Sequence, residues 1–212
     1  MAYLDTDDGG RVYYEHHRAP KLPVVLIHGW GMSGDYWASA VEALLADGHG
    51  AITVDHRGCG RSDRDFTDMS IDAIARDVAA IVERCELPRV ALNGWSLGGA
   101  VAVLAEGASG EGASEAMIGW VERGFLATGP RASTTLAGLA TLDQRDLLAS
   151  FDFPVLSIGG ARDSIADPAI AGFAANCAKD GTLLTLDTGH SPQLEAPSVY
   201  NEALLDFVRK LA

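Results

Sequence analysis

Apolar residues recur along the chain in two alternating patterns. Apolar-rich runs lie at 23–27, 51–54, 90–92, 154–158 and 182–186, and segments with apolar residues at helical spacing lie between most of them. The run 23–27 is apolar throughout, which is typical of a parallel strand that is buried on both faces. The alternation predicts an α/β domain, in which a mostly parallel, twisted sheet is flanked by helices through right-handed crossovers.

Turn and cap residues bound several of these elements. Residues 2–18 predict two short strands joined by a turn at 7–10. A helix is predicted over 35–47, with its end at Gly48, and another begins after Ser70. The last segment, 197–211, predicts an amphipathic helix that packs on the domain.

Composition narrows the class of protein. The chain has 212 residues, of which 48% are hydrophobic and 21% charged, which is typical of a single globular domain over 1–212. The formal charge of −13 disfavours nucleic acid and anionic membranes as partners. No apolar run approaches the length of about 20 residues that spans a bilayer, and the first ten residues are acidic and polar, so we expect a cytoplasmic protein. The sequence leaves the oligomeric state open.

The cysteines indicate no metal or disulfide chemistry. Cys59, Cys85 and Cys177 are odd in number, widely spaced and free of any C-x-x-C pattern. Reduced thiols are therefore expected rather than disulfides or a zinc site. We expect neither a metal nor a cofactor.

The most informative stretch is Gly94-Trp95-Ser96-Leu97-Gly98. It follows the apolar run 90–92 and precedes a helical pattern, so it predicts a strand, a tight turn and a helix. A serine at such a turn adopts a strained backbone conformation, and the flanking glycines remove Cβ atoms that would collide. The hydroxyl and the first N–H groups of the helix then face the same space. A packing turn with an incidental serine is the alternative.

Chemistry-bearing residues also follow other predicted strands. Asp163 follows the run 154–158, and His190 follows the run 182–186. Because parallel strands end at one edge of a sheet, both residues are expected near Ser96. The order along the chain is Ser, Asp, His.

Two further loops follow strands at this predicted edge. His28 begins the loop 28–31, whose glycines let the backbone turn and free an N–H group. We interpret His28 as a structural histidine that bonds the backbone of its own loop, rather than as a catalytic one. In the second loop, Asp55 and Arg57 are expected to brace the cleft, and His56 is expected to be a solvated residue rather than a base.

Together these motifs resemble those of the α/β-hydrolase family. The resemblance covers residues 10–106 and 153–211. The matching features are the nucleophile elbow at 94–98, the acid Asp163, the base His190, the oxyanion loop at 28–30 and a D-x-R-G-x-G-x-S segment at 55–62.

The resemblance implies acyl transfer on small carboxylic esters. Ser96 would be the nucleophile, His190 its base and Asp163 the acid that orients the imidazole. The backbone N–H groups of Trp30 and Leu97 would receive the oxyanion. Peroxidative and carbon–carbon bond hydrolysis use the same triad and stay open, whereas a serine nucleophile disfavours the dehalogenase and epoxide-hydrolase branches.

Other assignments accompany this one. The side chains of Trp30 and Trp95 are expected to bind the substrate. Asp167 is a rival for the acid role, but it precedes Pro168 and a predicted helix, where an Asp more often caps. Asp187 lies too near the end of its strand to be preferred.

Residues 106–152 depart from the family pattern. They begin with a Gly/Ser-rich connector, and 117–121 fits a helix better than a strand. We therefore expect the sixth strand to be missing or residual, and a reduced cap of about two helices over 107–152, one of them at 134–149. The Gly/Ser-rich connector at the start of this region favours an engineered deletion over a natural minimal form. An open cleft with broad selectivity and weak activity follows, and the alternative function is an inactive ligand-binding or scaffold protein.

Overall fold

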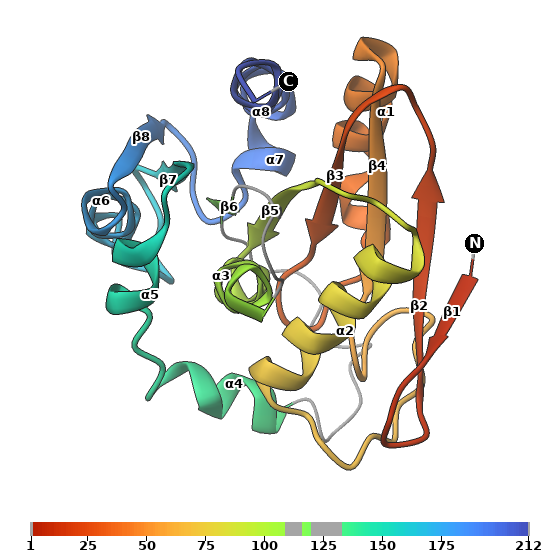
Figure 1. The fold of residues 1–212 in the computed structure, drawn as a ribbon. Helices are drawn as coiled ribbons and strands as arrows, with labels where there is room; N and C mark the ends of the chain where they lie inside the picture. The colour runs from red at the N-terminus through yellow and green to blue at the C-terminus, as the bar shows by residue number, and fades with distance from the viewer. Residues whose placement is uncertain (1, 109–115, 120–132, 212) are drawn as a thin grey trace.

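The computed structural model describes residues 2–108, 116–119 and 133–211, and its strands form one sheet (Figure 1). The strand order is β1-β2-β4-β3-β5-β6-β7-β8. Pairing is antiparallel from β1 to β2 and from β2 to β4, and parallel from β4 through β8. The strands are β1 (Ala2–Asp5), β2 (Arg11–His17), β3 (Lys21–Ile27), β4 (His49–Asp55), β5 (Ala91–Trp95), β6 (Ala116–Gly119), β7 (Pro154–Gly160) and β8 (Asp180–Leu186).

Helices pack on both faces of this sheet, which gives the predicted α/β architecture. The helices are η1 (Gly34–Trp37, a 3₁₀ turn), α1 (Ala38–Asp47), α2 (Ile71–Arg84), α3 (Leu97–Ala108), α4 (Ser133–Leu139), α5 (Arg145–Ser150), α6 (Ala169–Cys177), α7 (Pro192–Glu195) and α8 (Pro197–Arg209). Strand β3 shows how the two faces divide. Val25 and Ile27 belong to the cluster with α2 and α3, whereas Val24 and Leu26 belong to the cluster with α1 and α8. Successive side chains of a strand point to opposite faces, so a fully apolar strand is buried on both.

Local signals placed most boundaries correctly. Ser70 caps α2 by accepting a hydrogen bond from the N–H of Ala73, and Gly48 ends α1 in the left-handed conformation. The hairpin at 7–10 joins β1 to β2 as predicted. These signals act within a few residues, so they need no information from the rest of the fold.

The region 106–152 corrects two expectations. Strand β6 is present rather than missing: it pairs with β5 at four positions and with β7 at two, so residues 116–119 form a strand and not part of a helix. The gap between β5 and β7 supplies the hydrogen-bond partners that make so short a segment a strand. The helix predicted over 134–149 is divided into α4 and α5 by residues 140–144.

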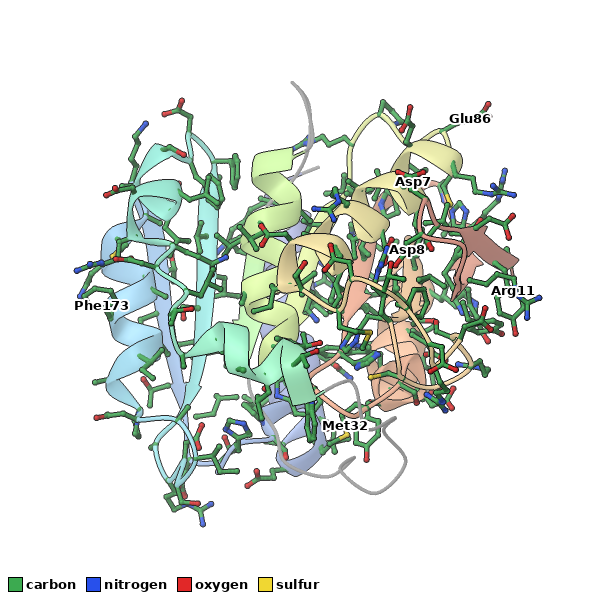
Figure 2. All side chains as sticks on the ribbon, turned by 90° about the horizontal axis from the view of Figure 1, so that it is seen from below. Asp7, Asp8, Arg11, Met32, Glu86 and Phe173 are labelled. Carbon is green, nitrogen blue, oxygen red and sulfur yellow. The ribbon has the colours of Figure 1, made fainter. Side chains whose placement is uncertain are left out.

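The carboxyl ends of the parallel strands define the functional edge. In Figure 2 this edge lies toward the bottom of the view, where Met32 of the loop after β3 is labelled, and Glu86, which precedes β5, lies at the opposite side. The loops after β3, β4, β5, β7 and β8 carry the residues that the sequence singled out. None of the described helices is both long and apolar enough to cross a membrane.

Candidate active site

Ser96 occupies the turn between β5 and α3, as the sequence predicts. Its φ angle is +59°, in the left-handed region that residues with a Cβ atom rarely adopt. The backbone conformation costs on the order of 1–3 kcal/mol, which the surrounding packing must offset. Strain held at a single partly exposed serine is typical of a nucleophile elbow.

The two glycines of the elbow are required by backbone contacts. A Cβ atom on Gly94 would lie 2.0 Å from the carbonyl oxygen of Gly98, and one on Gly98 would lie 2.1 Å from the carbonyl oxygen of Ile27. No side-chain rearrangement relieves a collision with a backbone atom. The spacing of the G-x-S-x-G motif is therefore explained by the contact of α3 with β5 and β3.

The loop after β3 lies against the nucleophile. A Cβ atom on Gly29 would be 2.8 Å from the Cβ atom of Ser96, so only glycine fits there. Leu97 is the first residue of α3, where backbone N–H groups have no intrahelical partner, and its side chain is buried. Trp30 follows Gly29 and packs partly buried on the α2–α3 face. The two predicted oxyanion donors therefore belong to segments that border Ser96.

His190 and Asp163 meet across the ends of β7 and β8. The distance from His190 Nδ1 to Asp163 Oδ2 is 2.7 Å, and the two side chains are only 7% and 4% exposed. The other carboxylate oxygen, Oδ1, accepts hydrogen bonds from the N–H groups of Ile165 and Ala166 at 2.8 and 3.0 Å. Bonds to both carboxylate oxygens fix the acid, and a carboxylate at Nδ1 places the proton there and leaves Nε2 as the basic nitrogen.

The rival carboxylates are engaged elsewhere. Asp167 Oδ1 accepts the N–H of Ala169 at the start of α6, the capping role predicted for it. Asp187 is highly exposed and pairs with Arg162 at 2.7 Å. The described contacts therefore place Asp163, and neither alternative, on the imidazole.

The position of Trp95 differs from the prediction. The Trp95 side chain was expected to bind the substrate, but it is fully buried and packs edge-on against Trp37. Its indole N–H donates to the carbonyl oxygen of His190 at 3.4 Å, a long hydrogen bond. Because the side chain of the residue before Ser96 points into the core, Trp95 connects the elbow to the histidine loop instead of contacting a ligand.

Glu195 is a site residue that the sequence analysis missed. From α7 it accepts the N–H groups of Gly189 and Ser191, at 2.7 and 2.9 Å, one on each side of His190. Carboxylate to N–H bonds of this kind are stronger than neutral ones and fix the loop. The sequence signal was weak, because Glu195 lies four residues after Ser191, one more than the S-x-x-E spacing of a capping box, and Ser191 makes no side-chain cap bond.

The loop after β3 rests on buried histidines. His28 bonds the carbonyl oxygen of Gly29 through Nδ1 at 2.7 Å, which confirms its structural interpretation, and its Nε2 accepts the N–H of His56 at 3.2 Å. Burial lowers the pKa of His28 to about 4, so the ring is neutral at pH 7. His56 is 1% exposed, so the prediction of a solvated residue is wrong. Its ring stacks on His28 and thereby supports the loop.

Among the residues with a described position, His28, His56 and Cys59 could offer metal ligands, since their ligand atoms lie within 4.8 Å of one another. Their geometry does not suit a metal. The two rings stack at 3.8 Å with an angle of 21° between their planes, so their nitrogen lone pairs lie in separate, nearly parallel planes, which disfavours a shared ion. Burial also raises the pKa of Cys59 to about 11, which disfavours the thiolate that a metal requires.

Asp55 and Arg57 brace the loop after β4. Asp55 is buried and accepts the N–H groups of Gly34 and Arg61 at 2.6 and 2.7 Å. Arg57 forms a bidentate pair with Asp77 at 2.6 and 2.8 Å. These bonds hold the loop in place at the edge where the site lies, as the sequence analysis expected.

Comparison with known proteins supports the fold. A family profile described as alpha/beta hydrolase fold matches residues 23–105. A putative carbamate hydrolase RutD from Azorhizobium caulinodans is 26% identical, over an alignment that covers 98% of both chains. A non-heme chloroperoxidase from Streptomyces lividans is 39% identical over 101 residues, which are 47% of this chain. The chain spans only 36% of the length of that chloroperoxidase.

The solved structures give the same fold. An esterase from Exiguobacterium antarcticum superposes with a TM-score of 0.85 over 98% of each chain, at 21% sequence identity.

The alignment with RutD has 262 positions, whereas this chain has 212 residues, so at least 50 positions have no residue of this chain.

Proposed function

We propose that this chain, whose fold is that of the α/β hydrolases, is a serine hydrolase that cleaves small carboxylic esters through an acyl-enzyme. The observation that carries the proposal is the buried hydrogen bond between Asp163 and His190, on the same sheet edge as the strained Ser96. An orienting acid, a base and a serine in this chain order are the residues that the reaction needs.

In the proposed mechanism, Ser96 Oγ attacks the ester carbonyl carbon while His190 Nε2 takes its proton. Asp163 holds the imidazole in the required tautomer and stabilises its positive charge. The oxyanion accepts hydrogen bonds from the N–H groups of Leu97 and Trp30, each worth about 3 kcal/mol of transition-state stabilisation. His190 then protonates the leaving alcohol, and water, deprotonated by His190, hydrolyses the acyl-enzyme.

We further propose that residues 107–152 are a reduced cap within the single domain 1–212. The described part of this region holds only β6, α4 and α5, and the unmatched positions in the RutD alignment are consistent with a shortened chain. A cap normally shapes the pocket over the nucleophile, so its reduction predicts an open cleft and broad selectivity for small or activated esters. Carbamate hydrolysis, the activity in the name of the RutD relative, would use the same nucleophile and base.

The test is hydrolysis of p-nitrophenyl esters of increasing chain length by the wild type, Ser96→Ala and Ser198→Ala. Ser198 is an exposed serine on α8, which makes it a matched control. We expect turnover of short esters that Ser96→Ala loses and Ser198→Ala keeps. A serine-directed phosphonate should label the wild type and Ser198→Ala but not Ser96→Ala.

If the folded wild type is inert and resists the phosphonate, the esterase proposal fails. The chain would then be a ligand-binding or scaffold protein of this fold, the alternative that the sequence left open.

A further inference from the structure

A cavity that Ser96 does not line lies between α3, α6 and the segment that joins α4 to α5. It has a volume of about 710 Å³, and Ala100 lies at its α3 side. We call it the α6 groove; its apolar walls include Leu139, Leu142, Leu148, Ile170, Phe173 and Ala174. Pockets for small ligands in proteins typically measure about 300–1,000 Å³ and have mainly apolar walls.

Large apolar side chains are exposed along this groove. Phe173 is 55% exposed and Ile170 is 44% exposed, both on α6. In Figure 2 Phe173 lies on the outer side of the molecule, with α6 behind it. Contiguous exposed apolar surface beside a cavity is typical of a binding site, whereas single exposed apolar residues are not.

The polar rim of the groove indicates which ligands fit. Arg145 Nε bonds both oxygens of Asp143, at 2.8 and 3.0 Å, so its charge is already neutralised. Asp143 and Arg145 are the charged members of the described lining, so the rim carries no net charge. A ligand carboxylate would leave water there without gaining an unpaired counter-charge. An uncharged chain suits both the walls and the rim.

The groove adjoins elements that carry the proposed catalytic residues. Gln144 Nε2 donates to the carbonyl oxygen of Ala100 at 2.8 Å, one helical turn after Ser96. Ile170 and Ala171 line both the groove and a small neighbouring cavity that Asp163 also lines. Neither Ser96 nor His190 is among the described lining residues of the groove, so it is distinct from the site of the proposed reaction.

We propose that the α6 groove binds an uncharged linear alkyl chain of medium length. The chain lies along the apolar wall residues, with its neutral polar end at the polar rim. Two sources share this chemistry: a free alcohol, and the acyl chain of an ester held at Ser96. Binding itself does not depend on the proposed esterase activity, although the second source does.

The test measures binding of butan-1-ol, hexan-1-ol and octan-1-ol to the wild type by NMR titration of backbone amide resonances. Burial of a methylene group contributes about 0.8 kcal/mol, so we expect affinity to rise by up to about fourfold for each carbon added. Octanoate should bind at least about tenfold more weakly than octan-1-ol, because its carboxylate would lose hydration without meeting an unpaired counter-charge at the rim.

Two variants locate the site. Ala140→Trp places an indole in the groove from an exposed position, and Phe173→Ser removes an exposed wall. Each should weaken octan-1-ol binding about tenfold or more, with little change in the melting temperature. Val199→Ser, at a comparably exposed apolar residue on α8, should bind like the wild type.

The proposal is overturned if octan-1-ol does not bind, if octanoate binds as tightly, or if both groove variants bind like the wild type. The ester chain-length series shows whether the alkyl chain comes from a free alcohol or from the ester held at Ser96. If Ala140→Trp loses activity on long esters only, the ligand is the substrate's own chain; an unchanged profile assigns the groove to a separate alcohol. Because the alcohol titration needs no turnover, failure of the esterase proposal leaves this result unaffected.

Discussion

Replacing Gly94 by Ala should disrupt the elbow in a way that can be calculated from the structure. The new Cβ atom would lie 2.0 Å from the carbonyl oxygen of Gly98, 2.5 Å from its carbonyl carbon and 2.7 Å from the nitrogen of Gly99. Protein Cβ atoms essentially never approach other atoms closer than 3.0 Å, so α3 must move by about 1 Å relative to β5. All three atoms belong to the backbone, so a change of rotamer cannot relieve the collision.

This displacement should affect both stability and catalysis. Overpacking of a close contact costs about 1–3 kcal/mol, and a backbone collision belongs at the upper end of that range. For a domain of this size, about 3 kcal/mol lowers the melting temperature by about 10 °C. A shift of about 1 Å in the position of Ser96 should lower kcat/KM about 100-fold.

The assay pairs urea unfolding with p-nitrophenyl acetate hydrolysis, and Gly138→Ala is the matched control. On α4 the added Cβ atom meets nothing closer than Ile71 Cδ1 at 3.6 Å, so the control should be neutral or gain about 0.5–1 kcal/mol from helix propensity. Equal stability and activity of Gly94→Ala and wild type would refute the reasoning. Loss of stability in both variants would refute it as well, because the effect would then not depend on the collision.

Three further predictions concern the residues around the site. Because burial lowers the pKa of His28 to about 4, below the value of about 6.5 in the unfolded chain, the unfolded state takes up the proton first as pH falls. The stability present above pH 6.5 should thus fall by about 3 kcal/mol by pH 4, as measured by urea unfolding. Glu195→Ala removes two hydrogen bonds beside His190 and should lower kcat/KM about tenfold at nearly constant melting temperature. Tyr200→Phe removes a buried hydroxyl 2.9 Å from Asn93 Oδ1 and should cost about 1–3 kcal/mol of unfolding free energy.

Each of these has a control. A His28→Gln variant cannot titrate at this position, so its loss of stability between pH 6.5 and 4 should be smaller; an equal loss contradicts the assignment. Glu195→Gln keeps an acceptor oxygen and should recover part of the activity, and no recovery would show that geometry alone is insufficient. A Tyr200→Phe protein as stable as wild type would show that Asn93 finds another partner.

The sequence by itself determined most of the architecture. The run 23–27 is apolar throughout, and the runs 51–54 and 154–158 are interrupted only by Thr53 and Ser157, so each favours a strand buried on both faces. Ser70 and Gly48 act within one helical turn, so they fixed helix boundaries locally. The glycine spacing around Ser96 likewise predicted a strained elbow, which the positive φ angle of Ser96 confirms.

The tertiary structure decided what local patterns could not. Residues 116–119 have weak strand character, and they form β6 because β5 and β7 offer hydrogen-bond partners on both sides. His56 looks like a loop residue in sequence, yet stacking on His28 buries it. Trp95 points into the core because strand alternation turns it away from the side of Ser96.

For the proposed triad too, the sequence predicted one part and the tertiary structure decided the other. Chain order and strand ends predicted that Asp163 and His190 lie at one edge of the sheet, but several carboxylates lie near that edge. Only the folded chain distinguishes them, because hydrogen bonds from Ile165 and Ala166 aim Asp163 at the imidazole, while Asp187 is held in solvent by Arg162. A sequence specifies which side chains reach an edge, whereas their direction depends on contacts between segments far apart in the chain.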